Sequence, residues 1–155
     1  MTASFEQLKS SYPSMVKEDF FRELGGQWPD LVDHPNYQNT CAVRLSVAWK
    51  GAGLSIPQRF KEAQDGAGSP LVLKVRMMRD LVVSEYGQPD WGMSKQPGVP
   101  INSSDIPRSS GIIAYHANWG HATGHFDLWD KTGFVGSGNF SDIQDGHAIE
   151  MWFLS

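Results

Sequence analysis

The segment at residues 38–49, with the sequence QNTCAVRLSVAW, constrains the fold most, because it predicts a helix that is apolar on nearly every side. Asn39 and Thr40 are both good N-cap residues, so this helix should begin at or just before Cys41. A helix of this kind has to be wrapped by the rest of the chain. The sequence therefore predicts a central, buried helix that carries a cysteine in its first turn.

Cys41 is the only cysteine in the 155 residues, so the chain cannot form an internal disulfide. A buried, inert thiol is the commonest fate of a lone cysteine. The start of a helix, however, carries a partial positive charge that stabilises a thiolate. Cys41 would therefore be a nucleophile if another part of the chain places a base beside it.

The remaining hydrophobic patterns predict helices first and strands second. Helical spacing occurs at residues 4–12 and 15–24, and again from Pro70, an N1 residue, to the stop at Gly87. Residues 88–110 are rich in Pro, Gly, Ser and Asn, which indicates a long connection that lines the substrate cleft.

Beyond Gly111 the pattern changes to short extended segments. We expect an α+β fold in one domain, residues 1–155, with the N-terminal helices packed on a C-terminal antiparallel sheet. The predicted strands are residues 112–117, 124–129, 133–137 and 148–154.

Charge and hydropathy exclude several classes of partner. The formal net charge is −4 and no block of Lys or Arg occurs, so we expect no binding to nucleic acid. No apolar stretch is long enough to span a membrane, and the N-terminus lacks the pattern of a secretory signal peptide. We expect a protein made in the cytoplasm without a cofactor, which leaves the cell only through a dedicated machine.

Among the five histidines, His125 is the best candidate for the base that Cys41 needs. It begins a predicted strand, and Gly124 before it leaves room for another group to approach. In α+β cysteine hydrolases the nucleophile lies at a helix N-terminus and the imidazole comes from a strand packed against that helix. We therefore expect His125 to take the thiol proton of Cys41.

A third polar group is needed to orient the imidazole. If Trp129 pairs with Phe134 across a turn, His125 lies opposite Gly138, and Asn139 is then the nearest suitable side chain. We expect Asn139 to accept the Nδ1–H of His125, which leaves Nε2 to face the thiol. The other candidates, favoured by a shifted register or by the strand face of His125 itself, are Ser137, Asp142 and Asp127.

Three segments together resemble the fourth family of type VI secretion amidase effectors, and they agree with it in order and spacing. They are NTCAVRLS at 39–46, the helix with MRDL at 78–81 that leads to YGQP at 86–89, and GHFDLWD at 124–130. The resemblance implies a papain-like fold of the NlpC type. It also implies an antibacterial toxin that the type VI apparatus delivers to the periplasm of target cells, where a cognate immunity protein blocks the cleft.

By the same resemblance, Cys41 is the nucleophile and His125 the general base of a DL-endopeptidase. The bond it cleaves is the amide between D-glutamate and meso-diaminopimelate in peptidoglycan stem peptides. The family usually has an aspartate as the third residue and further cysteines, whereas this chain has Asn139 at the expected place and no second cysteine. We expect three residues to contact the substrate: Asn39, Arg44 and Trp119. For Arg44, an ion pair with Asp80 or Glu18 is the alternative.

Two other functions fit parts of the sequence. His116, His121 and His125 lie close together in the chain, as the ligands of a zinc peptidase would, although the glycines beside them argue against a helical zinc motif. The six tryptophans would suit a module that binds cell-wall peptides or carbohydrates without catalysis. Both alternatives leave the capped Cys41 unexplained, so we expect no metal.

Overall fold

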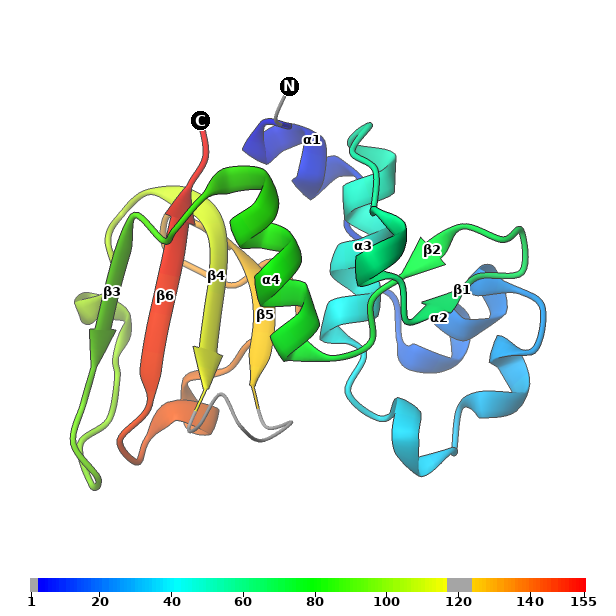
Figure 1. Ribbon diagram of the computed structural model, residues 1–155. Coiled ribbons are helices and arrows are strands. Elements are labelled where there is room, and N and C mark those ends of the chain that lie inside the picture. Colours follow the sequence, from blue (N-terminus) through cyan, green and yellow to red (C-terminus); the bar gives the residue numbers. More distant parts are fainter. Residues whose placement is uncertain (1–2, 117–123) are drawn as a thin grey trace.

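The computed structural model describes residues 3–116 and 124–155 and builds them around an antiparallel sheet with helices along one face (Figure 1). In the described residues this sheet has the strand order β3-β6-β4-β5. β5 therefore occupies one edge and β3 the other. The strands are β3 (Trp91–Ser94), β4 (Ser110–His116), β5 (His125–Asp130) and β6 (Ala148–Phe153).

The helices precede most of the sheet in the chain, as predicted. They are α1 (Phe5–Ser10), α2 (Lys17–Leu24), α3 (Cys41–Gly51) and α4 (Val75–Tyr86), with a small ribbon of β1 (Ala63–Gln64) and β2 (Pro70–Leu71) between α3 and α4. Short 3-10 helices lie at η1 (Trp28–Leu31), η2 (Pro35–Tyr37), η3 (Gln58–Phe60), η4 (Ser103–Asp105) and η5 (Phe140–Ile143).

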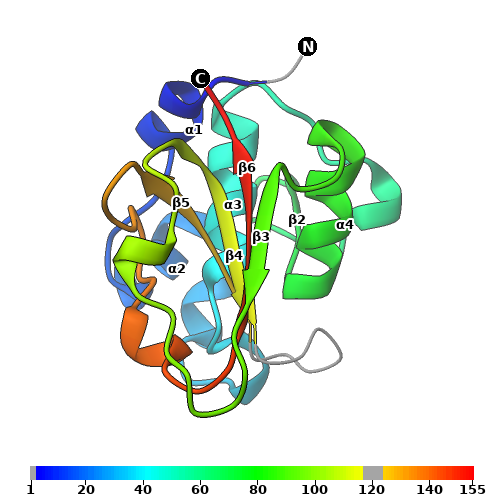
Figure 2. The same ribbon diagram turned by 90° about the vertical axis from the view of Figure 1, so that its left-hand side faces the viewer.

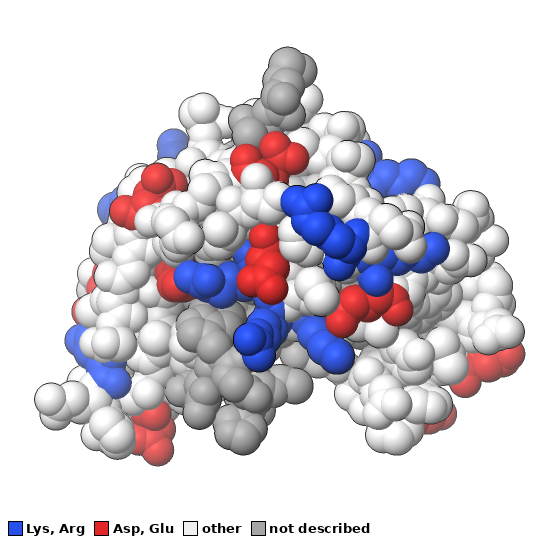
Figure 3. Space-filling view, in the orientation of Figure 1, with Lys and Arg blue, Asp and Glu red and all other residues white. Residues whose placement is uncertain are grey.

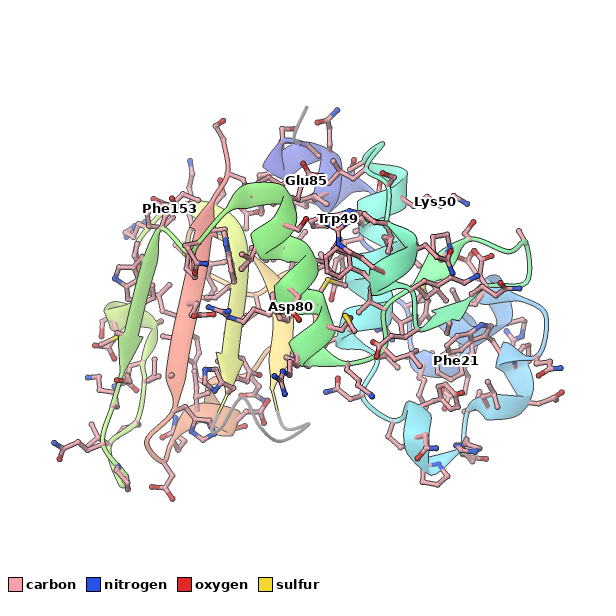
Figure 4. The ribbon with its side chains drawn as sticks, in the orientation of Figure 1. Phe21, Trp49, Lys50, Asp80, Glu85 and Phe153 are labelled. Atoms are coloured by element: carbon pink, nitrogen blue, oxygen red, sulfur yellow. The ribbon has the colours of Figure 1, made fainter. Side chains whose placement is uncertain are left out.

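The helix α3 begins at Cys41 and is buried along most of its length, which confirms the central prediction. Its side chains pack against α1, α4 and the edge strand β5. Trp49 is fully buried and lies against α4, where its ring makes an edge contact with Tyr86 (Figure 4). The all-round apolar sequence of α3 is thus explained by neighbours on several sides.

The sheet buries side chains on both of its faces. Figure 2 shows the strands from the β3 edge of the sheet. Alternate residues of each strand point to opposite faces. Ile112 and Ala114 join the core beneath α1, α3 and α4, while Ile113 and Tyr115 join a second core covered by loops and by η5. A third cluster around Phe21 joins α2 to η1 beyond α3 (Figure 4).

Three elements differ from the sequence predictions. The helix predicted from Pro70 begins only at Val75, because residues 70–71 pair with residues 63–64 as a strand. The connection at 88–110 contributes β3, which pairs with β6 at the sheet edge away from β5, so it does not line a cleft beside Cys41. Residues 133–137 form no regular strand, although the predicted pairing of Trp129 with Phe134 is present as an isolated bridge.

Charged side chains of both signs are mixed on the face that α4 crosses (Figure 3). Arg79 of α4 forms two hydrogen bonds of 2.8 Å with the carboxylate of Glu150 in β6, which tie the helix to the sheet. Among the described residues, no helix combines the length and apolar character that crossing a membrane requires.

Candidate active site

Asn39 fixes the start of α3 and joins it to the strand that carries His125. Its Oδ1 accepts the backbone N–H of Cys41 at 3.2 Å, and its Nδ2 donates to the carbonyl oxygen of Gly124 at 3.1 Å. A Cβ at Gly124 would lie 2.9 Å from a Val75 methyl group and 3.1 Å from the carbonyl oxygen of Tyr115, so only glycine fits there without movement. Asn39, which we expected to contact substrate, therefore positions the two chain segments of the site.

His125 lies between the Cys41 thiol and the Asp127 carboxylate. Its Nε2 is 2.8 Å from Oδ2 of Asp127, and Cys41 lies close enough to the imidazole to raise its pKa. Cys41 is 3% exposed and the His125 side chain is 11% exposed. The predicted pairing of Cys41 with His125 is therefore present in the structure, with Nδ1 as the nitrogen that Asp127 leaves free.

The electrostatics of His125 favour its charged form. Burial by itself lowers the pKa of an imidazole, but the hydrogen bonds to Asp127 and Cys41, and the charges of these two groups, raise the pKa of His125 to about 10. The protonated imidazole can donate one N–H to each neighbour. This arrangement suits a thiolate–imidazolium pair held in place by a carboxylate.

The Asp127 carboxylate is fully buried and accepts four hydrogen bonds. Oδ1 accepts the backbone N–H groups of Leu128 at 2.8 Å and Gly136 at 2.6 Å. Oδ2 accepts the N–H of Gly138 at 2.8 Å and faces His125. A Cβ at either glycine would lie within 2.9 Å of the carboxylate, so the loop must have glycine at both positions to wrap it this closely.

The prediction that Asn139 orients His125 is wrong. Oδ1 of Asn139 instead accepts the backbone N–H of Ser141 and caps η5. The predicted register holds as far as Val135, whose N–H donates to Leu128, but beyond this residue the chain leaves the sheet and turns its amides toward Asp127. The nitrogen facing the partner is also Nε2, not Nδ1.

Tyr115 supports the imidazole from the neighbouring strand, and sequence reasoning missed it. It pairs with His125 across β4 and β5, and the two ring centroids are 5.3 Å apart at an angle of 37°. Its hydroxyl donates to Asp142 at 2.8 Å and accepts the N–H of Asn139 at 3.3 Å. The alternating pattern of both strands could have indicated this pair, but only with the register between them known. Asp142, another candidate for the orienting residue, therefore contacts Tyr115.

Arg44 follows Cys41 by one helical turn and is 9% exposed. Its Nη1 donates to the carbonyl oxygens of Pro13 at 2.9 Å and Met15 at 2.7 Å. Its guanidinium carbon lies 4.6 Å from the centre of the Phe20 ring.

The alternative ion pair with Glu18 or Asp80 is not formed, and Asp80 lies on α4 (Figure 4). The other predicted substrate contact, Trp119, lies outside the described residues. Ser137 is not the residue that orients His125, because the imidazole contacts the carboxylate of Asp127 instead.

The zinc alternative is not supported by the described part of the site. Tyr115 and His125 share one face of the sheet, so His116, the next residue along β4, points to the opposite face. Across residues 3–116 and 124–155, no group of three or more His, Cys, Asp or Glu side chains is arranged to hold a metal ion. His121 lies outside these residues.

The comparisons with known proteins agree with this geometry. The fold matches the type VI effector Tae4 from Enterobacter cloacae with a TM-score of 0.80 and 20% identity over 100% of this chain and 98% of that one. It matches the effector–immunity system Tae4/Tai4 from Salmonella typhimurium with the same score and identity over 100% of both chains. A Tae4–Tai4 complex from Enterobacter cloacae matches at 0.77 and 19% identity, again over 100% of both.

These structural matches show a shared fold, with helices packed on an antiparallel sheet. A search of curated protein sequences finds no significant match. The model of one protein family, however, matches residues 37–153, a span that includes both Cys41 and His125. The chain belongs to the Tae4 family, described as type VI secretion system (T6SS), amidase effector protein 4.

Proposed function

We propose that this amidase effector is a cysteine DL-endopeptidase that cleaves the amide between D-glutamate and meso-diaminopimelate in peptidoglycan stem peptides. The observation that carries the proposal is the position of His125 between the Cys41 thiol and the buried Asp127 carboxylate. Cys41 is the nucleophile, His125 the general base and Asp127 the residue that orients the imidazole.

In the resting pair the thiol proton is on Nδ1 of His125, and in the first step the Cys41 thiolate attacks the carbonyl carbon of the scissile amide. The positive end of α3 stabilises the negative charge that develops on the carbonyl oxygen. His125 then gives the proton to the leaving amine, which departs and leaves a thioester on Cys41. Water, deprotonated by the same imidazole, hydrolyses this thioester and restores the thiol.

A nucleophile at a helix N-terminus, with the base on an adjacent strand, supports a papain-like mechanism and fold of the NlpC type. The solved complexes of Tae4 with Tai4 support a cognate immunity protein for this chain, and we propose that it covers the Cys41 site. The family supports delivery by the type VI apparatus into the periplasm of target cells, where the stem peptides are accessible.

Digestion of purified Gram-negative sacculi, followed by mass analysis of the released muropeptides, tests this function. The wild type should release fragments cut between D-glutamate and meso-diaminopimelate, and Cys41→Ala should release none. Iodoacetamide should abolish the wild-type activity, whereas a chelator should leave it unchanged. Cleavage of a different bond would refute the substrate assignment, and loss of activity on chelation would favour a metal enzyme.

A further inference from the structure

A cavity of about 260 Å³ lies beside the active site, between two segments that are far apart in the chain. The link between α1 and α2 forms one wall, the loop that wraps Asp127 forms another, and Arg44 of α3 also lines the cavity. The lining residues are Tyr12, Pro13, Ser14, Met15, Val16, Arg44, Val135, Gly136 and Ser137.

Arg44 brings to this cavity a positive charge that no carboxylate neutralises in the described chain. Its Nε donates to Thr40 and its Nη1 to two backbone carbonyls, which leaves Nη2 without a hydrogen-bond partner among the described residues. Because Nη2 is not fully buried, it retains contact with solvent. Buried charges in proteins are ordinarily paired, and burial here lowers the pKa of Arg44. An anionic ligand would supply the missing partner.

Tyr12 adds a second free donor to the wall of the cavity. The residue is 8% exposed, and its hydroxyl is buried with no hydrogen-bond partner in the described part of the chain. A Cβ built on Gly136 would lie 2.5 Å from this hydroxyl and 2.8 Å from Oδ1 of Asp127, which places Tyr12 next to the catalytic carboxylate. Arg44 and Tyr12 thus line one cavity with two donors, a guanidinium that keeps contact with solvent and a buried phenol that has no partner among the described residues.

From this geometry we infer that the cavity is the subsite for the free α-carboxylate of the D-glutamyl residue. The inference rests on the proposed function. D-Glutamate is linked through its γ-carboxyl group, so its α-carboxylate stays charged and is separated from the scissile carbonyl only by the aliphatic part of the same residue. Arg44 lies three residues after Cys41, on the same face of α3 and about 5 Å along its axis. A D-glutamyl residue can therefore place its scissile carbonyl at Cys41 and its α-carboxylate at Arg44.

Two synthetic stem peptides test the subsite: one with the α-carboxylate and one with an α-carboxamide at the same glutamyl residue. The wild type should show kcat/KM at least about tenfold higher for the carboxylate, as a charged hydrogen bond implies. Tyr12→Phe removes only the hydroxyl, which has no partner to lose in the described chain, and should lower this ratio mainly through KM. Arg44→Gln should abolish it.

Because Arg44 also holds the link between α1 and α2, its variant could fail to fold. A second pair of variants therefore tests the charge preference of the cavity by changing a residue at its mouth. Ser14 is exposed at the cavity mouth. Ser14→Glu should lower the carboxylate-to-carboxamide ratio, and Ser14→Lys should raise it. Ser104→Glu in η4 is the matched control, because Ser104 is exposed beside a separate cavity that Trp129 and Lys131 also line, at the end of β5 away from His125, and this change should leave both substrates unaffected.

Equal kcat/KM for the two peptides in the wild type, or Ser14 variants that leave the ratio unchanged, would overturn the subsite while the proposed cysteine amidase stands. If the wild type cleaves neither peptide, the proposed function fails, and binding decides the subsite separately. Calorimetric titration of Cys41→Ala with each peptide should then still show tighter binding of the carboxylate. Equal binding, or none, would overturn the inference.

Discussion

Replacing Asp127 by asparagine tests the assignment of the orienting residue with the smallest change in shape. The carboxylate accepts two hydrogen bonds on each oxygen, whereas an amide offers one oxygen and one NH₂ group. Oδ1 faces two backbone N–H groups, which can only donate, whereas Oδ2 faces one such group and an imidazole nitrogen that can become an acceptor. The amide oxygen should therefore stay with Leu128 and Gly136. The NH₂ group then faces Gly138 and His125.

This orientation has two consequences of different size. The N–H of Gly138 loses its acceptor, which should cost about 1–3 kcal/mol of the free energy of unfolding. The imidazole must turn its Nε2 into an acceptor, so its proton moves to Nδ1, the nitrogen that has to receive the proton of Cys41. A histidine held in the wrong tautomer by an Asp→Asn change lowers kcat about 10⁴-fold in serine proteases, and we expect a loss of this order in Asp127→Asn.

The assay is muropeptide release from sacculi, together with thermal unfolding of each variant. Asp142→Asn is the matched control, because Asp142 bonds to Tyr115 and not to the imidazole, so it should lose far less activity. Asn139→Ala removes only a cap of η5 and should also retain most of the rate. If Asp127→Asn works within tenfold of the wild-type rate, or if Asn139→Ala is the crippled variant, the assignment of Asp127 is wrong.

Four further changes have defined outcomes. Cys41→Ala should lower muropeptide release at least about 1,000-fold while circular dichroism stays native, because a nucleophile is lost with little packing volume. Asn39→Ala loses its bonds to Cys41 and Gly124 and should lower the free energy of unfolding by about 1–2 kcal/mol and lower kcat more than it changes KM. The pKa of His125 is raised to about 10, so its imidazolium should stabilise the fold fully below about pH 6.5 and lose this effect as pH rises toward 10. Urea unfolding measured against pH should show this loss of stability in the wild type and not in His125→Gln. Gly136→Ala should lower both stability and kcat, because its Cβ would lie 2.8 Å from the Asp127 carboxylate.

The sequence predicted the central parts of the fold because their signals were local. The apolar run after Cys41 is long enough to be unambiguous, and the strands that follow Gly111 are rich in residues that favour extended structure. Pro70 misled the prediction of α4, since a proline also fits the first residue of an edge strand and the pairing with residues 63–64 is not visible in the sequence. The same limit applies to β3, whose four residues need β6 as a partner.

The proximity of Cys41 and His125 was predictable from residue chemistry, but the contact of the imidazole with Asp127 was not. Cys41 and His125 each carry a local signal, a capped helix and a strand that begins after a glycine. Asp127 shares a strand face with His125, yet residues two apart on a strand normally point side by side and do not bond to each other. Here the carboxylate is held by the amides of Gly136 and Gly138, which arrive only because the chain leaves the sheet after Val135.

In the proposed enzyme, the loop at 136–138 links catalysis to the choice of substrate. Its N–H groups hold Asp127 and through it the imidazole, while Gly136 and Ser137 also line the cavity that we assign to the α-carboxylate. A ligand that orders this wall would also hold the orienting carboxylate in place, so binding energy from a group that does not react could stabilise the geometry of the reacting one. Changes at the loop should therefore alter kcat and substrate preference together, whereas changes at Ser14 on the opposite wall should alter preference alone.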